Sequence, residues 1–412
     1  MVRPNDRKVL RDLAKQIAEI SQSPQQAEKK RRWLVHNSLK PGLPMVLAFP
    51  EGGWRELLPE SEYCADPSLR WMETHLRMTL FTHQVIQDDQ ICDAFFNVPL
   101  VIVNNYWGME VPRVRTEELG SYRWDPPLKH LSDIKKLKPL TLAVDEEKTR
   151  TWLETARDIL GDILPVRLRR GGLVWPVSVA DAAAYFRGLD RLMMDMVEHP
   201  SWVHELMGFL CQTRLKSLRE LESSGWLTLN NENDYVGSGG VGYTDELPRV
   251  GFVPGKVRLK DRWGFAEAQT LVGISPEMLD AFFISHILPE MECYGLNCYG
   301  CCEPLHDRLD VVTKIPRLRR ISISPWADLE KSARYLEGRY VFSWKPNPAP
   351  LAADRMDEEE VRRSLAAGLR ILKEHGCVVE IVMKDTHTFR GDVTRISRWV
   401  RIARQAVEDV WK

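Results

Sequence analysis

Strand-like and helix-like segments alternate through the last third of the chain, and this alternation constrains the fold more than any other feature. Four short apolar runs lie there with helical patterns between and after them. The runs are 296–302, 320–324, 341–344 and 378–383, and the helical segments are 327–336, 357–375 and 392–410. Short connections between such segments are typical of βα units, whose strands lie parallel in one sheet.

Four further apolar runs precede these, at 45–49, 98–103, 173–177 and 227–230, with helical patterns at 180–196, 200–223 and 276–286. Eight strands of this kind favour an α/β fold of the (β/α)8 type, a closed TIM barrel, over an open doubly wound sheet. No Gly-x-Gly-x-x-Gly motif follows any run, which argues against a dinucleotide-binding half. Apolar residues at helical spacing predict one helix over 6–34. We therefore expect a helical N-terminal extension over 1–40 and one barrel domain over 41–412.

Charge and hydropathy argue against two classes of partner. The 412 residues carry a formal net charge of −1, which gives no reason to expect nucleic acid or an anionic membrane as partner. No apolar run approaches the roughly 18 residues that a membrane span needs. The first residues lack the apolar segment of a signal peptide, so we expect a cytoplasmic protein whose thiols stay reduced.

Half of the eight cysteines fall within 293–302, at the end of a strand-like run. Thiolates that lie close together suit zinc or a comparable metal, and they also suit a redox pair. A reducing compartment favours the metal. Strand alternation places Tyr299, Cys301 and Glu303 on one face, which we assign to the barrel mouth, and Cys298 and Cys302 on the opposite face. Cys301 and Glu303 are therefore the first candidates for the site, and Cys302 is the second.

Other candidates stand at or near the ends of predicted strands, where the functional residues of a barrel gather. His387 follows the run 378–383 and lies beside Asp385, as a candidate ligand or general acid. The remaining candidates are polar or aromatic residues that could line a pocket: Asn231, Glu267, Trp326, Lys345, Asn347 and Lys384. The lysines and Asn347 could hold an anionic substrate. The alternative for all of them is ordinary hydrogen bonding within loops.

The second half of the chain resembles the uroporphyrinogen decarboxylase superfamily. The resemblance covers roughly residues 75 to 410 and is strongest after Trp263. It is carried by WGFAEAQTLVGISPEML at 263–279, by MDMVEHPSWVHELM at 194–207, and by YGLNCYGCCEPLHDRLDVVTKIPRLRRISISPWADLEKSARYLEGRYVFSWKPNPAPL at 294–351. The resemblance implies a (β/α)8 barrel.

The superfamily has a decarboxylase branch and a branch of methyltransferases that use a corrinoid. The arginine-containing N-terminal motif of the decarboxylases, Pro-x-Trp-x-Met-Arg-Gln-Ala-Gly-Arg, is absent; residues 32–37 read RWLVHN instead. Methyltransferases that act on thiols bind zinc through His-x-Cys and a late cysteine. Here Tyr299-Gly300-Cys301 occupies the first position, and His387 lies near the second. Related demethylases use carboxylates and a histidine, which makes Glu303 and His387 reasonable ligands.

The resemblance implies methyl transfer between a small O-, N- or S-methyl compound and a corrinoid (cobalamin) carried by a partner protein, with zinc activating the heteroatom. The expected metal ligands are Cys301, Cys302, Glu303 and His387, the expected catalytic residues are Tyr299, Glu267 and Asp385, and the expected substrate-binding residues are Asn231, Trp326, Lys345, Asn347 and Lys384. A homodimer is also allowed. Two alternatives stay open: a metal-free decarboxylase or lyase of a carboxylated aromatic or tetrapyrrole, and a non-enzymatic corrinoid-binding protein.

Overall fold

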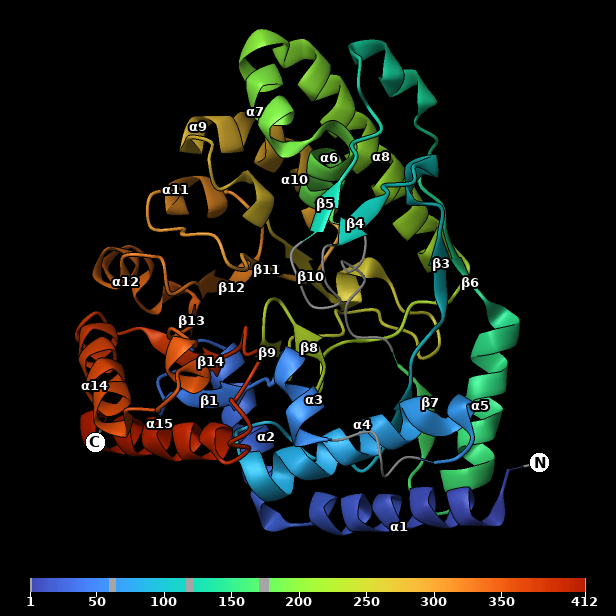
Figure 1. The fold of residues 1–412 in the computed structure, drawn as a ribbon, viewed down its shortest axis with the longest axis vertical. Coiled ribbons are helices and arrows are strands. Elements are labelled where there is room, and N and C mark those ends of the chain that lie inside the picture. The colour runs from blue at the N-terminus through green and yellow to red at the C-terminus, as the bar shows by residue number, and fades with distance from the viewer. Residues whose placement is uncertain (1, 59–63, 116–121, 170–177, 412) are drawn as a thin grey trace.

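A computed structural model describes residues 2–58, 64–115, 122–169 and 178–411 of the chain (Figure 1). Its main element is a parallel sheet of six strands in the order β1-β14-β13-β12-β11-β10. The strands are β1 (Met45–Ala48), β10 (Trp263–Ala266), β11 (Leu296–Tyr299), β12 (Leu318–Ile323), β13 (Val341–Trp344) and β14 (Val378–Met383). All five strand pairings are parallel, so the α/β class expected from the sequence is confirmed.

Helices connect and cover these strands, as the βα pattern predicts (Figure 1). In the C-terminal part these are α11 (Leu309–Val312), α12 (Leu329–Leu336), α13 (Ala349–Ala352), α14 (Glu358–Glu374) and α15 (Arg395–Trp411). The caps follow the usual chemistry: Asp328 and Asp357 accept hydrogen bonds from the first free amides of α12 and α14. Strands β13 and β14 are buried at every position, which explains why their sequences read as unbroken apolar runs.

The sheet is strongly curved rather than flat. Arg320 on β12 and Glu380 on β14 form an ion pair at 2.8 Å across the intervening strand. Cys302, which follows β11, contacts Asp385, which follows β14, with Sγ and Oδ2 3.8 Å apart. Three inter-strand steps of about 4.8 Å would separate these two strands by roughly 14 Å in a flat sheet. The concave side therefore brings together groups from distant strands.

The N-terminal region adds a group of helices to the sheet. It contains α1 (Pro4–Ser21), α2 (Pro24–Asn37), α3 (Trp54–Leu57), α4 (Arg70–Phe81) and α5 (Glu146–Leu160). The prediction of a single helix over 6–34 is wrong, because Pro24 begins a new helix after a break at Gln22 and Ser23. Leu10, Leu76 and Ile159 lie in one buried cluster that joins α1, α4 and α5.

Smaller strand pairs complete the fold. They are β2 (Phe96–Val98) with β7 (Val166–Leu168), β3 (Ile102–Asn104) with β6 (Leu142–Val144), β4 (Arg113–Arg115) with β5 (Tyr122–Trp124), and β8 (Tyr235–Val236) with β9 (Gly240–Val241). The predicted run 98–103 is split between β2 and β3, and 227–230 is not a strand. The run 173–177 lies outside the described residues.

The remaining helices pack mainly on the outer side of β10 and β11. They are α6 (Val179–Arg187), α7 (Leu189–Glu198), α8 (Pro200–Ser223), α9 (Pro276–Leu279) and α10 (Ser285–Met291). The predicted helix over 180–196 is interrupted at Gly188, whose φ of 87° ends α6. None of the helices in the described ranges has the length and apolar character needed to cross a membrane.

Candidate active site at the carboxyl ends of the strands

Charged and thiol side chains gather where the parallel strands end. Cys301 and Cys302 follow β11, Lys345 follows β13, and Lys384 and Asp385 follow β14. The carboxyl ends of parallel strands lie at one edge of a sheet, and ligands bind there in open and closed α/β folds alike. The cysteine cluster and the positions at strand ends thus pointed to these five residues in the sequence, and the structure brings them together.

The two thiols form a close pair. Cys301 Sγ and Cys302 Sγ are 3.6 Å apart, and Ser238 Oγ, from the β8–β9 hairpin, lies 3.3 Å from Cys301 Sγ. Cys302 Sγ lies 3.8 Å from Oδ2 of Asp385. Cys301 is buried and Cys302 is partly exposed.

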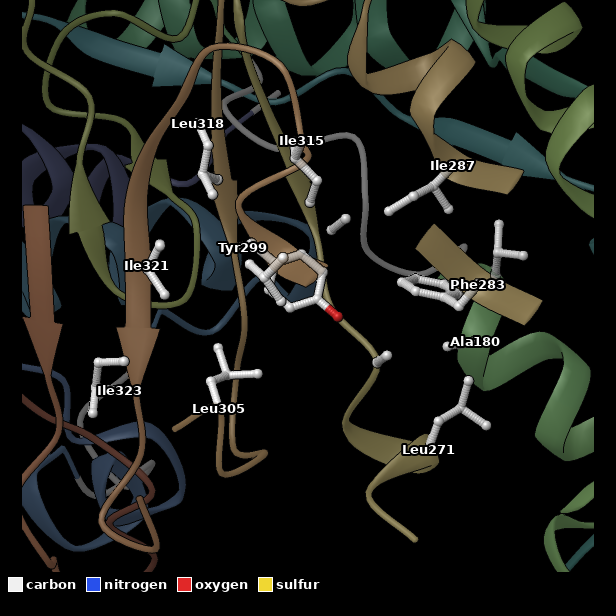
Figure 2. Close-up of a cluster of buried hydrophobic side chains, with 14 of the residues drawn as sticks. Ala180, Leu271, Phe283, Ile287, Tyr299, Leu305, Ile315, Leu318, Ile321 and Ile323 are labelled. Carbon is white, nitrogen blue, oxygen red and sulfur yellow. The ribbon is translucent and has the colours of Figure 1, made fainter. Parts of the chain in front are cut away.

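Gly300 determines how this pair is presented. Its φ of 93° breaks the strand alternation directly after Tyr299, so Cys301 turns toward the hairpin that carries Ser238. Cys298 lies on the concave side, 3.8 Å from Nη1 of Arg320. Tyr299 instead packs on the helix side with Phe283 and other buried residues (Figure 2). The predicted division into an inner face with Tyr299 and an outer face with Cys298 is therefore wrong.

Two buried lysines flank the thiols and differ in their surroundings. Lys345 Nζ donates to Cys301 O at 3.3 Å and to Ser322 Oγ. Burial, together with the charge of Lys384, lowers the pKa of Lys345 to about 8. Lys384 Nζ contacts Glu51 Oε1 at 3.2 Å and Tyr235 OH at 3.3 Å. Burial works against its charge, but Tyr235, Glu51 and Cys301 hold the pKa of Lys384 above its usual value.

The thiol pair shares one proton unequally. A hydrogen bond from Cys302 lowers the pKa of Cys301 to about 6, with the charges of Lys345 and Lys384 acting in the same direction against burial. The hydrogen bond to Cys301 and burial raise the pKa of Cys302. Near neutral pH, Cys301 is therefore a thiolate that Cys302 and the lysines stabilise, and a thiolate is both a nucleophile and a metal ligand.

A second group of acids lies behind the thiols. Glu303 accepts from Cys301 N at 2.8 Å and from Ala268 N at 3.1 Å, so both of its oxygens face backbone amides. Glu267 accepts from Ser178 Oγ at 2.5 Å and from Gln269 N at 2.9 Å. Burial and the neighbouring carboxylates of Asp181 and Glu303 raise the pKa of Glu267 to about 8, and burial raises that of Asp181 to about 6. Glu267 thus holds a proton at neutral pH.

Four predicted residues lie apart from this centre. Trp326 is 68% exposed, and Asn347 is exposed and accepts from Ala349 N at 2.9 Å. His387 is exposed, and its ring lies against Gly52, where an added Cβ would be 2.7 Å from Nδ1. Asn231 donates to Leu247 O at 2.7 Å and so ties down its own loop. Within the described residues, no hydrogen bond or ion pair joins any of these four side chains to the thiols.

Sequence reasoning missed several members of the site. Glu51 follows β1, so its strand-end position could have revealed it. Ser238 and Tyr235 come from the β8–β9 hairpin, and Asp181 lies in the first turn of α6. No local signal places those three beside the thiols.

The thiols fit two corners of a tetrahedral zinc site. Two thiolates bound at about 2.3 Å lie roughly 3.8 Å apart, close to the 3.6 Å seen here. Asp385 offers an oxygen beside Cys302. Across the described part of the chain, the group with three ligand atoms within 4.8 Å of one another is elsewhere, at Asp195, Glu198 and His199. In that group Asp195 already pairs with Arg187 at 2.5 Å.

Comparison with known proteins reveals a shared fold. No family model and no curated protein matches the chain. Among solved structures, a methyltransferase from Methanosarcina mazei superimposes with a TM-score of 0.50 at 11% sequence identity, covering 93% of this chain and 99% of that one. The near-complete coverage shows that the likeness extends over the whole fold rather than one motif.

Proposed function

We propose that the protein is a methyltransferase that moves a methyl group between a small methylated compound and a corrinoid carried by a partner protein. The observation that carries this proposal is the Cys301–Cys302 pair, which has one sulfur held as a thiolate at the carboxyl ends of a parallel sheet. Its fold is shared with a protein described as a methyltransferase. The sequence resemblance points to the same chemistry.

We further propose that the curved sheet belongs to a closed (β/α)8 barrel. The six strands with β1 beside β14 and the parallel pair β2–β7 support this proposal. So does the short distance between groups that follow β11 and β14. A barrel mouth at the thiols would be open to the corrinoid of a partner.

Zinc would be held by Cys301 and Cys302, with Asp385 as the carboxylate beside them. When bound there, it would polarise the heteroatom that carries the methyl group, because an ether or an amine is otherwise a poor leaving group. Glu303 and His387 are weaker ligand candidates than the sequence suggested, since Glu303 faces two amides and His387 lies against Gly52.

The other side chains have roles that follow from their positions. Lys345 and Lys384 keep Cys301 ionised and can hold an anionic group of the substrate. Ser238 fixes the Cys301 sulfur. Glu267 carries a proton at neutral pH and is the candidate donor to the heteroatom that loses its methyl group. Tyr299 packs among buried residues on the helix side, so it is not a catalytic candidate in this arrangement.

The direct test follows the ultraviolet–visible spectrum of cobalamin as it gains or loses a methyl group in the presence of the protein. A panel of O-, N- and S-methyl compounds is offered. We expect at least one to react, and Cys301→Ser to lower the rate by roughly 10–100-fold or more. Cys293→Ser, outside the site, is the matched control. Wild-type protein that leaves both the free and the methylated cobalamin unchanged with every compound would refute the proposal.

A metal-free lyase is the second candidate, because Lys345 and Lys384 could grip a substrate carboxylate without any metal. This reaction would release carbon dioxide from a carboxylated aromatic or tetrapyrrole. This candidate would be favoured over methyl transfer if metal-free protein released carbon dioxide while the spectrum of cobalamin stayed unchanged.

A further inference from the structure

A cavity of about 290 Å³ lies between α4, the start of β2 and the segment that follows β1. Small-molecule pockets begin at roughly 300 Å³, so this cavity has room for a compound with one or two rings. It is distinct from the thiol centre, since neither cysteine of the pair lines it. Its wall does continue toward that centre, because Phe49 and Pro50 directly precede Glu51, which pairs with Lys384.

Aromatic side chains form much of the wall. Phe49, Trp54, Phe95 and Phe96 all line the cavity, and Phe95 is 40% exposed. The Arg167 guanidinium covers one face of the Phe95 ring, 4.0 Å from its centroid, and an apolar occupant would cover aromatic surface that is left open to the cavity. Aromatic walls of this kind accept flat rings, and they attract cations to the ring faces.

The polar groups of the wall accept hydrogen bonds and carry no positive charge. Burial lowers the pKa values of His75 and His83, that of His83 to about 3, so both imidazoles are neutral. Asp93 accepts from Tyr243 OH at 2.7 Å through Oδ1, and within the described residues its Oδ2 has no hydrogen-bond donor. No lysine or arginine is among the residues that line this cavity.

The arginines nearby are already paired. Arg167 contacts Glu232 at 2.5 Å, and Arg169 contacts Asp234 at 2.6 Å. Their charges are therefore balanced by carboxylates, and the cavity has Asp93 as its own charged group. Lys29 also lies nearby, and its Nζ donates to Asp88 O at 2.6 Å and to Gln90 O at 3.0 Å. An anionic ligand would meet the Asp93 carboxylate in the wall itself, whereas a cationic ligand would gain that carboxylate as a partner.

We propose that this cavity binds a small aromatic compound bearing an amine, with its ring between the aromatic walls and its ammonium group on Asp93. Because this is a statement about binding alone, it does not depend on methyl transfer and can be tested without zinc or corrinoid.

Three isosteric probes separate the charge states: benzylamine, which is protonated at pH 7, benzyl alcohol, which is neutral, and benzoate, which is an anion. Titration calorimetry of the full chain should show that affinity falls from benzylamine to benzyl alcohol to benzoate. The dissociation constants of the first two should differ roughly tenfold. Asp93→Asn should reduce the preference for benzylamine over benzyl alcohol to about threefold or less. Asp310→Asn, at an exposed position on α11, is the matched control and should leave the affinities for all three probes unchanged.

Phe95→Ala gives a second readout that does not depend on the folding of Asp93→Asn. The Phe95 side chain is partly exposed, so the fold should tolerate its truncation. The affinity for all three probes should fall together. Equal binding of benzoate and benzylamine, or no binding of benzylamine, would overturn the proposal. So would unchanged binding of benzylamine by the Asp93→Asn and Phe95→Ala proteins.

Discussion

At Cys301, several polar groups act on one sulfur atom. Cys302 Sγ lies 3.6 Å from it, Ser238 Oγ lies 3.3 Å away, and Lys345 and Lys384 supply positive charge. Each of these groups arrives from a different strand end or hairpin. The thiolate is therefore a product of the fold and not of the local sequence, although the two adjacent cysteines are what the sequence displays.

Gly300 should be more sensitive to substitution than Gly376. A Cβ at Gly300 would lie 2.8 Å from Leu305 Cδ1, while one at Gly376, whose φ is also positive, would meet nothing within 4 Å. Gly376→Ala should therefore cost only the backbone strain, about 1–2 kcal/mol. Gly300→Ala should cost about 1–3 kcal/mol more through overpacking. Urea denaturation measures both, and equal costs would contradict this explanation of the turn.

All eight cysteines should be free thiols in the purified protein. None forms a disulfide among the described residues, and adjacent cysteines close only a strained ring, against the geometry that disulfides prefer. Thiol titration of the unfolded chain without reductant should count eight. A count of six would mean that one pair is oxidised, with Cys301 and Cys302 as the first suspects.

At the scale of elements, the ion pair between β12 and β14 is the best-defined link across the concave side. Arg320 and Glu380 are almost fully buried, so removing one charge leaves the other without its oppositely charged partner. Arg320→Met should cost about 3–5 kcal/mol, and the double change Arg320→Met/Glu380→Met should cost much less than the sum of the single changes. Arg334→Met, from the exposed pair with Glu330, is the control and should cost less than about 1 kcal/mol. Additive costs in the cycle would contradict the coupling.

The same pair should shape the response to acid. Although burial opposes its charge, Arg320 and His36 hold the pKa of Glu380 at about 2, below its ordinary 4.5. A depressed folded pKa stabilises the fold above the unfolded value, and that contribution is lost as the pH falls from about 4.5 toward 2. Chemical denaturation across this range should show a smaller loss of stability for Glu380→Gln than for the wild type. If the free energy of unfolding fell equally with pH in the wild type and in Glu380→Gln, this role of Glu380 would be contradicted.

Elements were predictable where burial leaves a strong signal. The ranges 341–344 and 378–383 match β13 and β14 because strands buried on both faces read as apolar runs. Strand β10 was missed, since Trp263-Gly-Phe-Ala contains a glycine, and β7 was missed because it is only three residues long. In the site, strand ends predicted Cys301, Lys345 and Lys384. The orientation of Tyr299 was not predictable, because it depends on the backbone at Gly300.

At the scale of the whole molecule, we propose that one edge of the sheet assembles a thiolate centre that holds a metal for methyl transfer. The zinc content of the purified full chain tests this claim most directly. We predict close to one zinc per chain in the wild type, and its loss in Cys301→Ser/Cys302→Ser. His199→Ala, in the separate group with Asp195 and Glu198, should keep its zinc. Metal-free wild-type protein that still transfers methyl groups, or zinc retained by the double variant and lost by His199→Ala, would contradict the account.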